Sequence, residues 1–204
     1  MTTRGTAAYD HAGDLPELVA AAVAAARRAG FGNSCGPEHG ELLRTLARGI
    51  GPGTIGETGT GCGVGLAWLA SGAHPGARLV SVEHDPAVAR VAAAVFAGDP
   101  RVEILTADWR ALVRHGPFDL LVLDGGGHGK QGGEPIDVDV WLRPGGVLAI
   151  DDFTPSRGWP PLHRGQPDHA RLHWLLHPAM LTTELRLTPS SASLVGRHTG
   201  IRTV

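Results

Sequence analysis

Several residue types are scarce in this chain, and each shortage excludes something. The 204 residues include only two cysteines, Cys35 and Cys62, too few for a disulfide framework, which indicates a reducing compartment. The first residues lack the apolar core of a signal peptide, and no apolar run is long enough to span a bilayer. We therefore expect a cytoplasmic protein with no membrane contact.

An excess of charge of one sign is also missing. The formal net charge is −2, charges of both signs are interspersed, and Lys130 is the only lysine. Without a basic surplus the chain has no general attraction for nucleic acid, which argues against such a partner. The length suits one domain with a full core, and we expect it to cover residues 1–204. Residues 1–50 would form an N-terminal helical cover, and residues 51–204 a cofactor-binding core.

The remaining residues form a regular alternation of elements. Two helices are predicted first, at 14–29 with Asp14 as N-cap and from Pro37 to about residue 48. Strands are then predicted at 53–57, 78–83, 101–105, 118–123 and 147–150, and helices at 64–71, at 86–97, after Asp108 and before Leu142. Short apolar strands separated by helices predict an α/β fold with a doubly wound, mostly parallel sheet. A helix at 168–177 and strands at 181–187 and 192–198, joined by a turn at 188–191, predict a terminal antiparallel hairpin.

Residues 57–65, with the sequence E-T-G-T-G-C-G-V-G, carry most of the functional information. Three alternating glycines between a strand and a helix let the backbone turn tightly and approach a ligand, while the helix N-terminus attracts negative charge. A dinucleotide site would need Gly-x-Gly-x-x-Gly, but the sixth residue is Val64 counted from Gly59 and Leu66 counted from Gly61. This spacing argues against an NAD-dependent dehydrogenase. The acid Glu57 at the strand end would repel a pyrophosphate but could accept a hydrogen bond from an ammonium group.

The glycine pattern resembles motif I of the class I S-adenosylmethionine-dependent methyltransferases, and residues 80–86 and 106–109 match the same family in order and spacing. The resemblance implies a seven-stranded Rossmann-like sheet and S-adenosylmethionine as methyl donor. It implies that Glu83 binds the ribose hydroxyls and that Asp108 contacts the adenine, with Trp109 stacking on the ring. A plain helix N-cap is the competing interpretation of Asp108, and both roles can hold together. The cofactor-binding set that we expect is Glu57, Gly59, Thr60, Gly61, Gly63, Glu83, His84, Asp108, Trp109 and Asp124.

Two further segments, residues 36–43 and 142–152, resemble the catechol and caffeoyl-CoA O-methyltransferase branch of that family. The branch holds a divalent cation with aspartates that follow its fourth and fifth strands. The resemblance therefore implies Mg²⁺ or another divalent cation on Asp124, Asp151 and Asp152, where it would activate a substrate hydroxyl.

The loop after Asp124 departs from that branch because it is richer in glycine, with the sequence G-G-G-H-G-K-Q-G-G. Its candidate general bases are His128 and Lys130, which join Asp124 as predicted catalytic residues. A mobile glycine loop with incidental polar residues is the alternative. Residues 152–168 are expected to form a lid over the acceptor with Trp159 as an apolar wall, or else a crossover that packs Trp159 for stability.

The sequence thus favours O-methylation of a small-molecule hydroxyl, with or without a metal. Two alternatives stay open: a methyltransferase of the same fold that acts on RNA or protein, and an S-adenosylmethionine-binding protein without catalysis. The N-terminal helices would supply the contact if the chain forms a homodimer. The sequence does not identify the acceptor.

Overall fold

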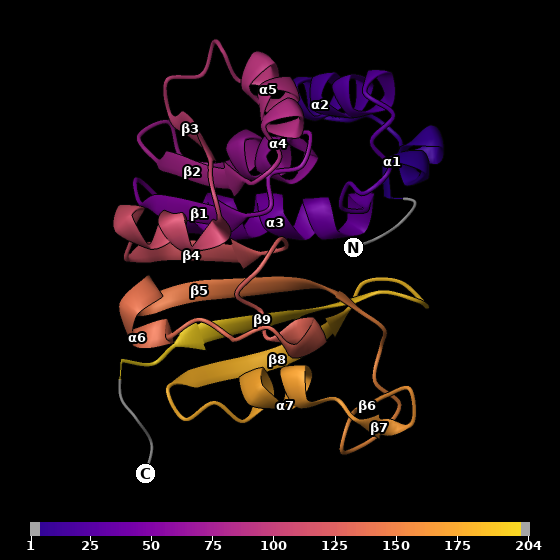
Figure 1. The fold of residues 1–204 in the computed structure, drawn as a ribbon, viewed down its shortest axis with the longest axis vertical. Helices are drawn as coiled ribbons and strands as arrows, with labels where there is room; N and C mark the ends of the chain where they lie inside the picture. Colours follow the sequence, from indigo (N-terminus) through magenta and orange to yellow (C-terminus); the bar gives the residue numbers. More distant parts are fainter. Residues whose placement is uncertain (1–4, 201–204) are drawn as a thin grey trace.

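The computed structural model describes residues 5–200, which form one large mixed sheet covered by helices on both faces (Figure 1). Its strand order is β3-β2-β1-β4-β5-β9-β8, and a separate two-stranded ribbon pairs β6 with β7. The strands are β1 Thr54–Thr58, β2 Arg78–Glu83, β3 Val102–Thr106, β4 Phe118–Leu123, β5 Leu142–Phe153, β6 Leu162–His163, β7 Gln166–Pro167, β8 Met180–Arg186 and β9 Ala192–His198. β1 to β5 are parallel, and β9 is antiparallel to both β5 and β8. The predicted sheet and its terminal antiparallel hairpin are confirmed.

The helices lie in two layers on either side of the sheet. The α-helices are α1 Gly5–Ala8, α2 Glu17–Arg28, α3 Pro37–Ile50, α4 Val64–Gly72, α5 Pro86–Val95, α6 Val138–Trp141 and α7 His169–Leu175, and the 3₁₀ helices are η1 Tyr9–His11, η2 Trp109–His115 and η3 Lys130–Gly132. Residues of α2, α3, α4 and α5 pack into one core cluster, and residues of η2, α6 and α7 pack into the other.

Strand β4 shows why the central strands are rich in apolar residues. Leu120 and Val122 are buried in the cluster beneath α2 to α4, whereas Leu121 and Leu123 are buried in the opposite cluster. Because successive side chains of a strand point to opposite faces, a strand covered on both sides needs apolar residues on both of its faces. This pattern holds the carboxyl ends of β1, β4 and β5 rigidly side by side.

Three local predictions were wrong or incomplete. Helix α2 begins at Glu17, and its N-cap position is Pro16 with no side-chain cap, so Asp14 does not cap it. The proline explains this, since it disfavours helical conformation in the residue before it. Strand β5 is longer than the predicted 147–150 and runs from Leu142 to Phe153, with a register shift opposite β4 between Phe118 and Leu120. The loop at 152–168 contains the small β6–β7 hairpin.

The N-terminal segment is tied onto the loop that follows α2. The Thr6 hydroxyl donates to the Phe31 carbonyl oxygen at 2.7 Å and lies 2.8 Å from the Ser34 hydroxyl. A side chain at Gly5 would collide with the Ser34 carbonyl. Figure 1 shows α1 and the β6–β7 hairpin at the same end of the sheet, the end toward which β5 runs. Within residues 5–200, no helix combines the length and apolar character needed to cross a membrane.

Helix α3 offers a direct test of this packing, because it holds two glycines in different surroundings. A Cβ at Gly40 would lie 2.1 Å from Nε1 of Trp68, a buried indole that donates to the Tyr9 hydroxyl at 2.8 Å. A Cβ at Gly49 would meet nothing within 4 Å. We expect Gly40→Ala to lower the free energy of unfolding by about 1–3 kcal/mol through overpacking. Gly49→Ala should raise it by about 0.5–1 kcal/mol through helix propensity.

Urea unfolding of both variants measures the difference. Equal effects of the two substitutions would contradict the proposed contact between α3 and Trp68.

Candidate active site

Three cavities lie along the carboxyl edge of the parallel strands, where open α/β sheets bind their ligands. A cavity of about 90 Å³ lies between the ends of β2 and β3 and includes Glu83, Asp108 and Trp109 in its lining. A second, of about 260 Å³, is lined by Gly59, Gly61, Glu83 and Asp124 among others. A third, of about 650 Å³, lies beyond the end of β5 and is lined in part by Asp151 and Asp152.

The smallest cavity has an aromatic wall that the fold holds in place. Trp109 lies 5.8 Å from Trp141, centroid to centroid, and a Cβ at Gly126 would come within 2.5 Å of its ring. Asp108 accepts a hydrogen bond from the Arg110 N–H at 3.0 Å, so its predicted N-cap role is confirmed, on a 3₁₀ helix. The Arg110 backbone N–H holds the pKa of Asp108 below its usual value, together with the nearby Arg110 guanidinium. A flat, polar-edged ring fits this wall and this carboxylate.

The middle cavity is built around the glycine loop and Glu83. The Glu83 carboxylate accepts hydrogen bonds from the N–H groups of Gly61 at 2.9 Å and Asp85 at 3.0 Å. It is only 8% exposed, whereas the neighbouring His84 side chain is largely exposed, with Nδ1 at 3.0 Å from Oε1 of Glu83. Glu83 therefore stands at the end of β2 with a fixed orientation, facing the backbone of the loop.

Three residues of the glycine loop are in close contact with neighbouring segments. At Gly59, which has φ of +88°, a Cβ would lie 2.5 Å from the Gly125 backbone nitrogen. At Gly63, which has φ of +91°, it would lie 2.8 Å from the Phe96 ring. The Thr60 hydroxyl lies 2.6 Å from that of Ser81. Phe31 and Asn33, in the loop after α2, also line this cavity.

Glu57 lies behind the loop and outside the lining of the three cavities. It is 2% exposed, accepts a hydrogen bond from the Ser81 hydroxyl at 2.6 Å, and has Oε1 2.6 Å from where a Cβ of Gly65 would stand. Burial raises the pKa of Glu57 to about 8, and the charges of Asp124 and Glu83 act in the same direction, while the Ser81 hydrogen bond opposes them. In this structure its carboxyl braces the start of α4 against β2.

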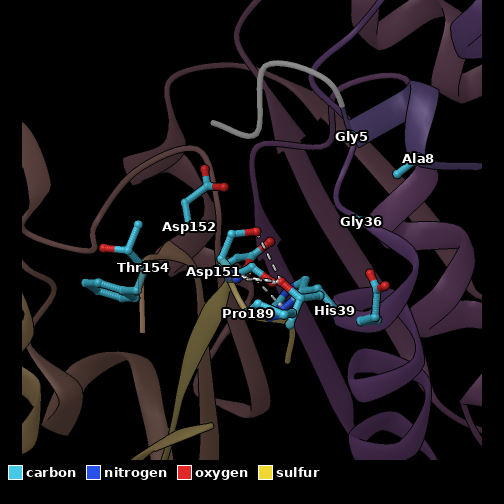
Figure 2. Close-up of a pocket in the computed structure, with 13 residues that line it drawn as sticks. Gly5, Ala8, Gly36, His39, Asp151, Asp152, Thr154 and Pro189 are labelled. Atoms are coloured by element: carbon cyan, nitrogen blue, oxygen red, sulfur yellow. Dashed lines mark hydrogen bonds and ion pairs between the residues drawn. The ribbon is translucent and has the colours of Figure 1, made fainter. Parts of the chain in front are cut away.

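A buried polar network lies in the wall of the cavity beyond β5. The Ser193 hydroxyl donates to Oδ1 of Asp151 at 3.1 Å and accepts from Nδ1 of His39 at 2.8 Å, and that Nδ1 lies 3.4 Å from the same carboxylate oxygen. All three residues are less than 10% exposed. Burial lowers the pKa of His39, although Asp151 and Asp152 oppose the shift. Figure 2 shows Asp151 joined to His39, while the Asp152 side chain points to the other side.

The glycine-rich loop after β4 brings the only lysine to the same edge. Lys130 Nζ donates to the carbonyl oxygen of Asp151 and lies 4.0 Å from the centroid of the Phe153 ring. Burial lowers the pKa of Lys130, and the carboxylates of Asp152, Asp151 and Asp124 oppose that shift. Burial raises the pKa of Asp124 to about 7, reinforced by the charges of Asp151 and Asp152.

His128 is held differently from Lys130. Its Nδ1 accepts a hydrogen bond from the Lys130 N–H at 3.1 Å, and its carbonyl oxygen accepts one from Trp174 at 2.9 Å. Burial lowers the pKa of His128 to about 4, so the ring is neutral at pH 7. Neither His128 nor Lys130 is among the described residues that line the cavity beyond β5.

Comparison with known proteins agrees with this geometry. A family model described as "Methyltransferase domain" matches residues 57–153. The catechol O-methyltransferase of Mycobacterium tuberculosis is 34% identical over 158 residues, which are 69% of this chain and 71% of that protein. This chain belongs to the class I S-adenosylmethionine-dependent methyltransferases.

Solved structures of other methyltransferases share the fold. The O-methyltransferase TomG of Streptomyces achromogenes, in complex with SAM, superposes with a TM-score of 0.70 at 21% identity and covers 96% of both chains. An O-methyltransferase of Bacillus cereus in complex with SAH also gives 0.70, at 18% identity, over 95% of this chain and 96% of that one. The Rossmann-like architecture predicted from the sequence is therefore confirmed.

The divalent cation implied by the resemblance does not fit the described side chains of this methyltransferase. No three His, Cys, Asp or Glu residues within 5–200 are grouped as metal ligands. Asp151 already binds Ser193 and lies beside His39, and Asp152, with φ of +61°, is turned away from it. The ammonium group of Lys130 already supplies a positive charge at this edge.

The structure also brings together residues for which no role was predicted. His39 lies in a segment whose resemblance to related enzymes was apparent, but its partner Ser193 is 154 residues further along the chain. Ser193 reaches His39 and Asp151 because β9 inserts beside β5. No local sequence pattern predicts this contact, because a single serine in a strand and a single histidine in a helix are both common.

Burial of Glu57 leads to a prediction about stability. Its pKa is raised from 4.5 to about 8 in the folded protein, so the folded state binds more protons than the unfolded state between these values. Stability should therefore fall as pH rises from about 5 to 8, with a contribution of up to about 1.4 kcal/mol per pH unit. In Glu57→Gln this part of the pH dependence should disappear.

Urea unfolding at pH 5, 6, 7 and 8 measures this slope, with Glu103→Gln, on the half-exposed side chain that pairs with Arg78, as the control. If Glu57→Gln keeps the wild-type slope, the buried carboxyl is not its source.

Proposed function

We propose that this methyltransferase transfers the methyl group of S-adenosylmethionine to a hydroxyl group of a small molecule. The supporting observation is the position of two cavities at neighbouring strand ends: Asp124 lines one at the end of β4, and Asp151 lines the other at the end of β5. A donor in the first and an acceptor in the second would meet between these strands. The relative that is named a catechol O-methyltransferase supports a hydroxyl as acceptor.

The cofactor would lie across the two smaller cavities. We assign its adenine to Trp109 and Asp108, its ribose hydroxyls to Glu83 beside His84, and its amino-acid part to the loop of Gly59, Thr60, Gly61 and Gly63 and to Asp124. Glu57 would act from behind, by holding this loop against β2. When bound, S-adenosylmethionine supplies a methyl group already activated by a sulfonium, so the protein needs mainly to align the acceptor and to remove its proton.

For proton removal we assign the first role to Asp124, because its carboxyl lies at the junction of donor and acceptor sites. Lys130 would stabilise the negative charge that develops on the acceptor oxygen, since its ammonium group lies among the carboxylates at this edge. His128 is the second candidate base, with its Nδ1 engaged by the Lys130 N–H. We derive no step through a divalent cation on Asp124, Asp151 and Asp152, because no three such side chains within residues 5–200 are grouped as metal ligands.

The cofactor assignment is tested by ligand-induced stabilisation. S-adenosylhomocysteine should raise the melting temperature, whereas NAD should leave it unchanged. Glu83→Gln should weaken S-adenosylhomocysteine binding roughly tenfold to a hundredfold, because the amide loses charge-assisted hydrogen bonds to the ribose. Glu103→Gln, on the half-exposed end of the Arg78 ion pair, should bind normally. Stabilisation by NAD alone would exclude the proposed cofactor.

A second experiment tests whether Lys130 or a divalent cation supplies the positive charge near the acceptor oxygen. Methyl transfer from labelled S-adenosylmethionine should continue in EDTA, and Lys130→Met should lower kcat roughly 100-fold while S-adenosylhomocysteine affinity stays the same. A titration of Mg²⁺ or Mn²⁺ into wild type and Asp151→Ala completes the test. If EDTA abolishes activity, and Asp151→Ala alone loses metal affinity, then the three aspartates form a metal site after all.

A further inference from the structure

A second large cavity adjoins the proposed acceptor site. It has a volume of about 720 Å³ and shares Thr154, Pro189 and Ser190 with the cavity that contains Asp151. It is formed by the loop that follows β5 and by the end of β8. The two cavities together greatly exceed the space that one hydroxylated ring requires.

The two cavities carry opposite charge. The inner cavity is lined by Glu38, Asp151 and Asp152, whereas the described lining of the outer cavity contains Arg157 and Arg186 and no carboxylate. Neither arginine takes part in an ion pair among residues 5–200. The outer cavity is therefore suited to an anion and the inner cavity repels one.

The nearest carboxylate of β8 does not neutralise these arginines. Glu184 binds the guanidinium of Arg171 at 2.7 Å and accepts from the Ser156 N–H at 2.7 Å. Arg171 is 1% exposed and also binds Asp168 at 3.1 Å and the Thr154 carbonyl oxygen at 2.9 Å. This buried network holds the loop at Thr154 and Ser156 before Arg157 and at Asp168 after it. The wall of the outer cavity is therefore anchored to the rest of the fold.

The same wall carries exposed apolar surface. Trp159 is 67% exposed and Leu162 is 55% exposed, and both line the outer cavity. Trp159 therefore does not pack into the core for stability. A tryptophan face beside two guanidinium groups suits a planar, apolar body that ends in an oxyanion.

We propose that the acceptor is an elongated hydroxyl compound that carries a carboxylate or phosphate away from the hydroxyl, and that Arg157 and Arg186 bind this oxyanion while Trp159 contacts the body. The inference rests on the proposed O-methylation of a small molecule. Charge separation then sets the orientation, because the carboxylates of the inner cavity turn the anionic end outward and the hydroxyl toward the methyl donor. The outer arginines thus select both the acceptor and the hydroxyl group that is methylated.

The test uses matched acceptors with labelled S-adenosylmethionine, built on hydroxybenzoate, hydroxycinnamate and hydroxynaphthoate scaffolds. Each is tested as the free acid, as its methyl ester, and as an analogue in which a phosphate monoester replaces the carboxylate while the acceptor hydroxyl stays free. For every scaffold that is methylated, we expect kcat/KM of an anionic form to exceed that of the ester at least tenfold. The Arg157→Ala/Arg186→Ala double variant should lose this preference through a higher KM for the anion, with the ester unaffected. A preference for acid or for phosphate identifies the oxyanion.

Arg164→Ala is the matched control, because Arg164 is an exposed arginine in the turn between β6 and β7 and does not line either cavity. It should keep the wild-type preference. Esters methylated as well as acids and phosphates, or an equal loss in Arg164→Ala, would overturn the anion site while leaving O-methylation intact. If S-adenosylhomocysteine binds but no scaffold is methylated in any form, the proposed acceptor class itself fails.

Discussion

The close approach of two backbone segments, at Gly59 after β1 and Gly125 after β4, is the constraint on which the site depends. The Thr58 carbonyl oxygen accepts from the N–H groups of Gly125 at 2.6 Å and Asp124 at 3.1 Å, and a Cβ at either glycine would strike the other segment. This contact sets the position of the glycine loop, to which we assign the cofactor, relative to Asp124. Since Asp124 begins the loop that carries Lys130, the same contact orients the reacting edge.

Two buried polar groups extend that constraint to either side. Behind the loop, Glu57 and Ser81 join β1 to β2, and burial makes this acid costly to ionise. At the wall of the proposed acceptor cavity, Ser193 joins Asp151 to His39, and so connects β9 with β5 and α3. Such hydrogen bonds are strong where water is excluded, and they fix the strand ends to which the methyl donor and acceptor would bind.

The charged side chains are distributed unevenly along this edge of the sheet. Carboxylates gather where the strands β4 and β5 end, Lys130 stands among them, and two arginines without ion-pair partners among the described residues line the cavity further out. Phe153 connects these regions, because Lys130 Nζ lies 4.0 Å and the Arg171 guanidinium carbon 4.9 Å from its ring centroid. The buried network of Arg171 then anchors the outer loop. The arrangement thus couples the wall of the outer cavity to the position of the lysine.

The sequence by itself determined the fold class and the terminal hairpin, because apolar periodicity and turn residues are local properties of the chain, and its glycine spacing carried the resemblance that implies the methyl donor. It also predicted Glu83, Asp108 and Asp124 as site residues, since each lies at or just after the end of a predicted strand, and the structure places all three in the linings of cavities at that edge. Only the tertiary structure decided that Glu57 lies behind its loop, that His39 meets Ser193, and that Lys130 reaches Asp151. These are contacts between segments far apart in the sequence, and their geometry follows from how helices and strands pack, which no local pattern encodes.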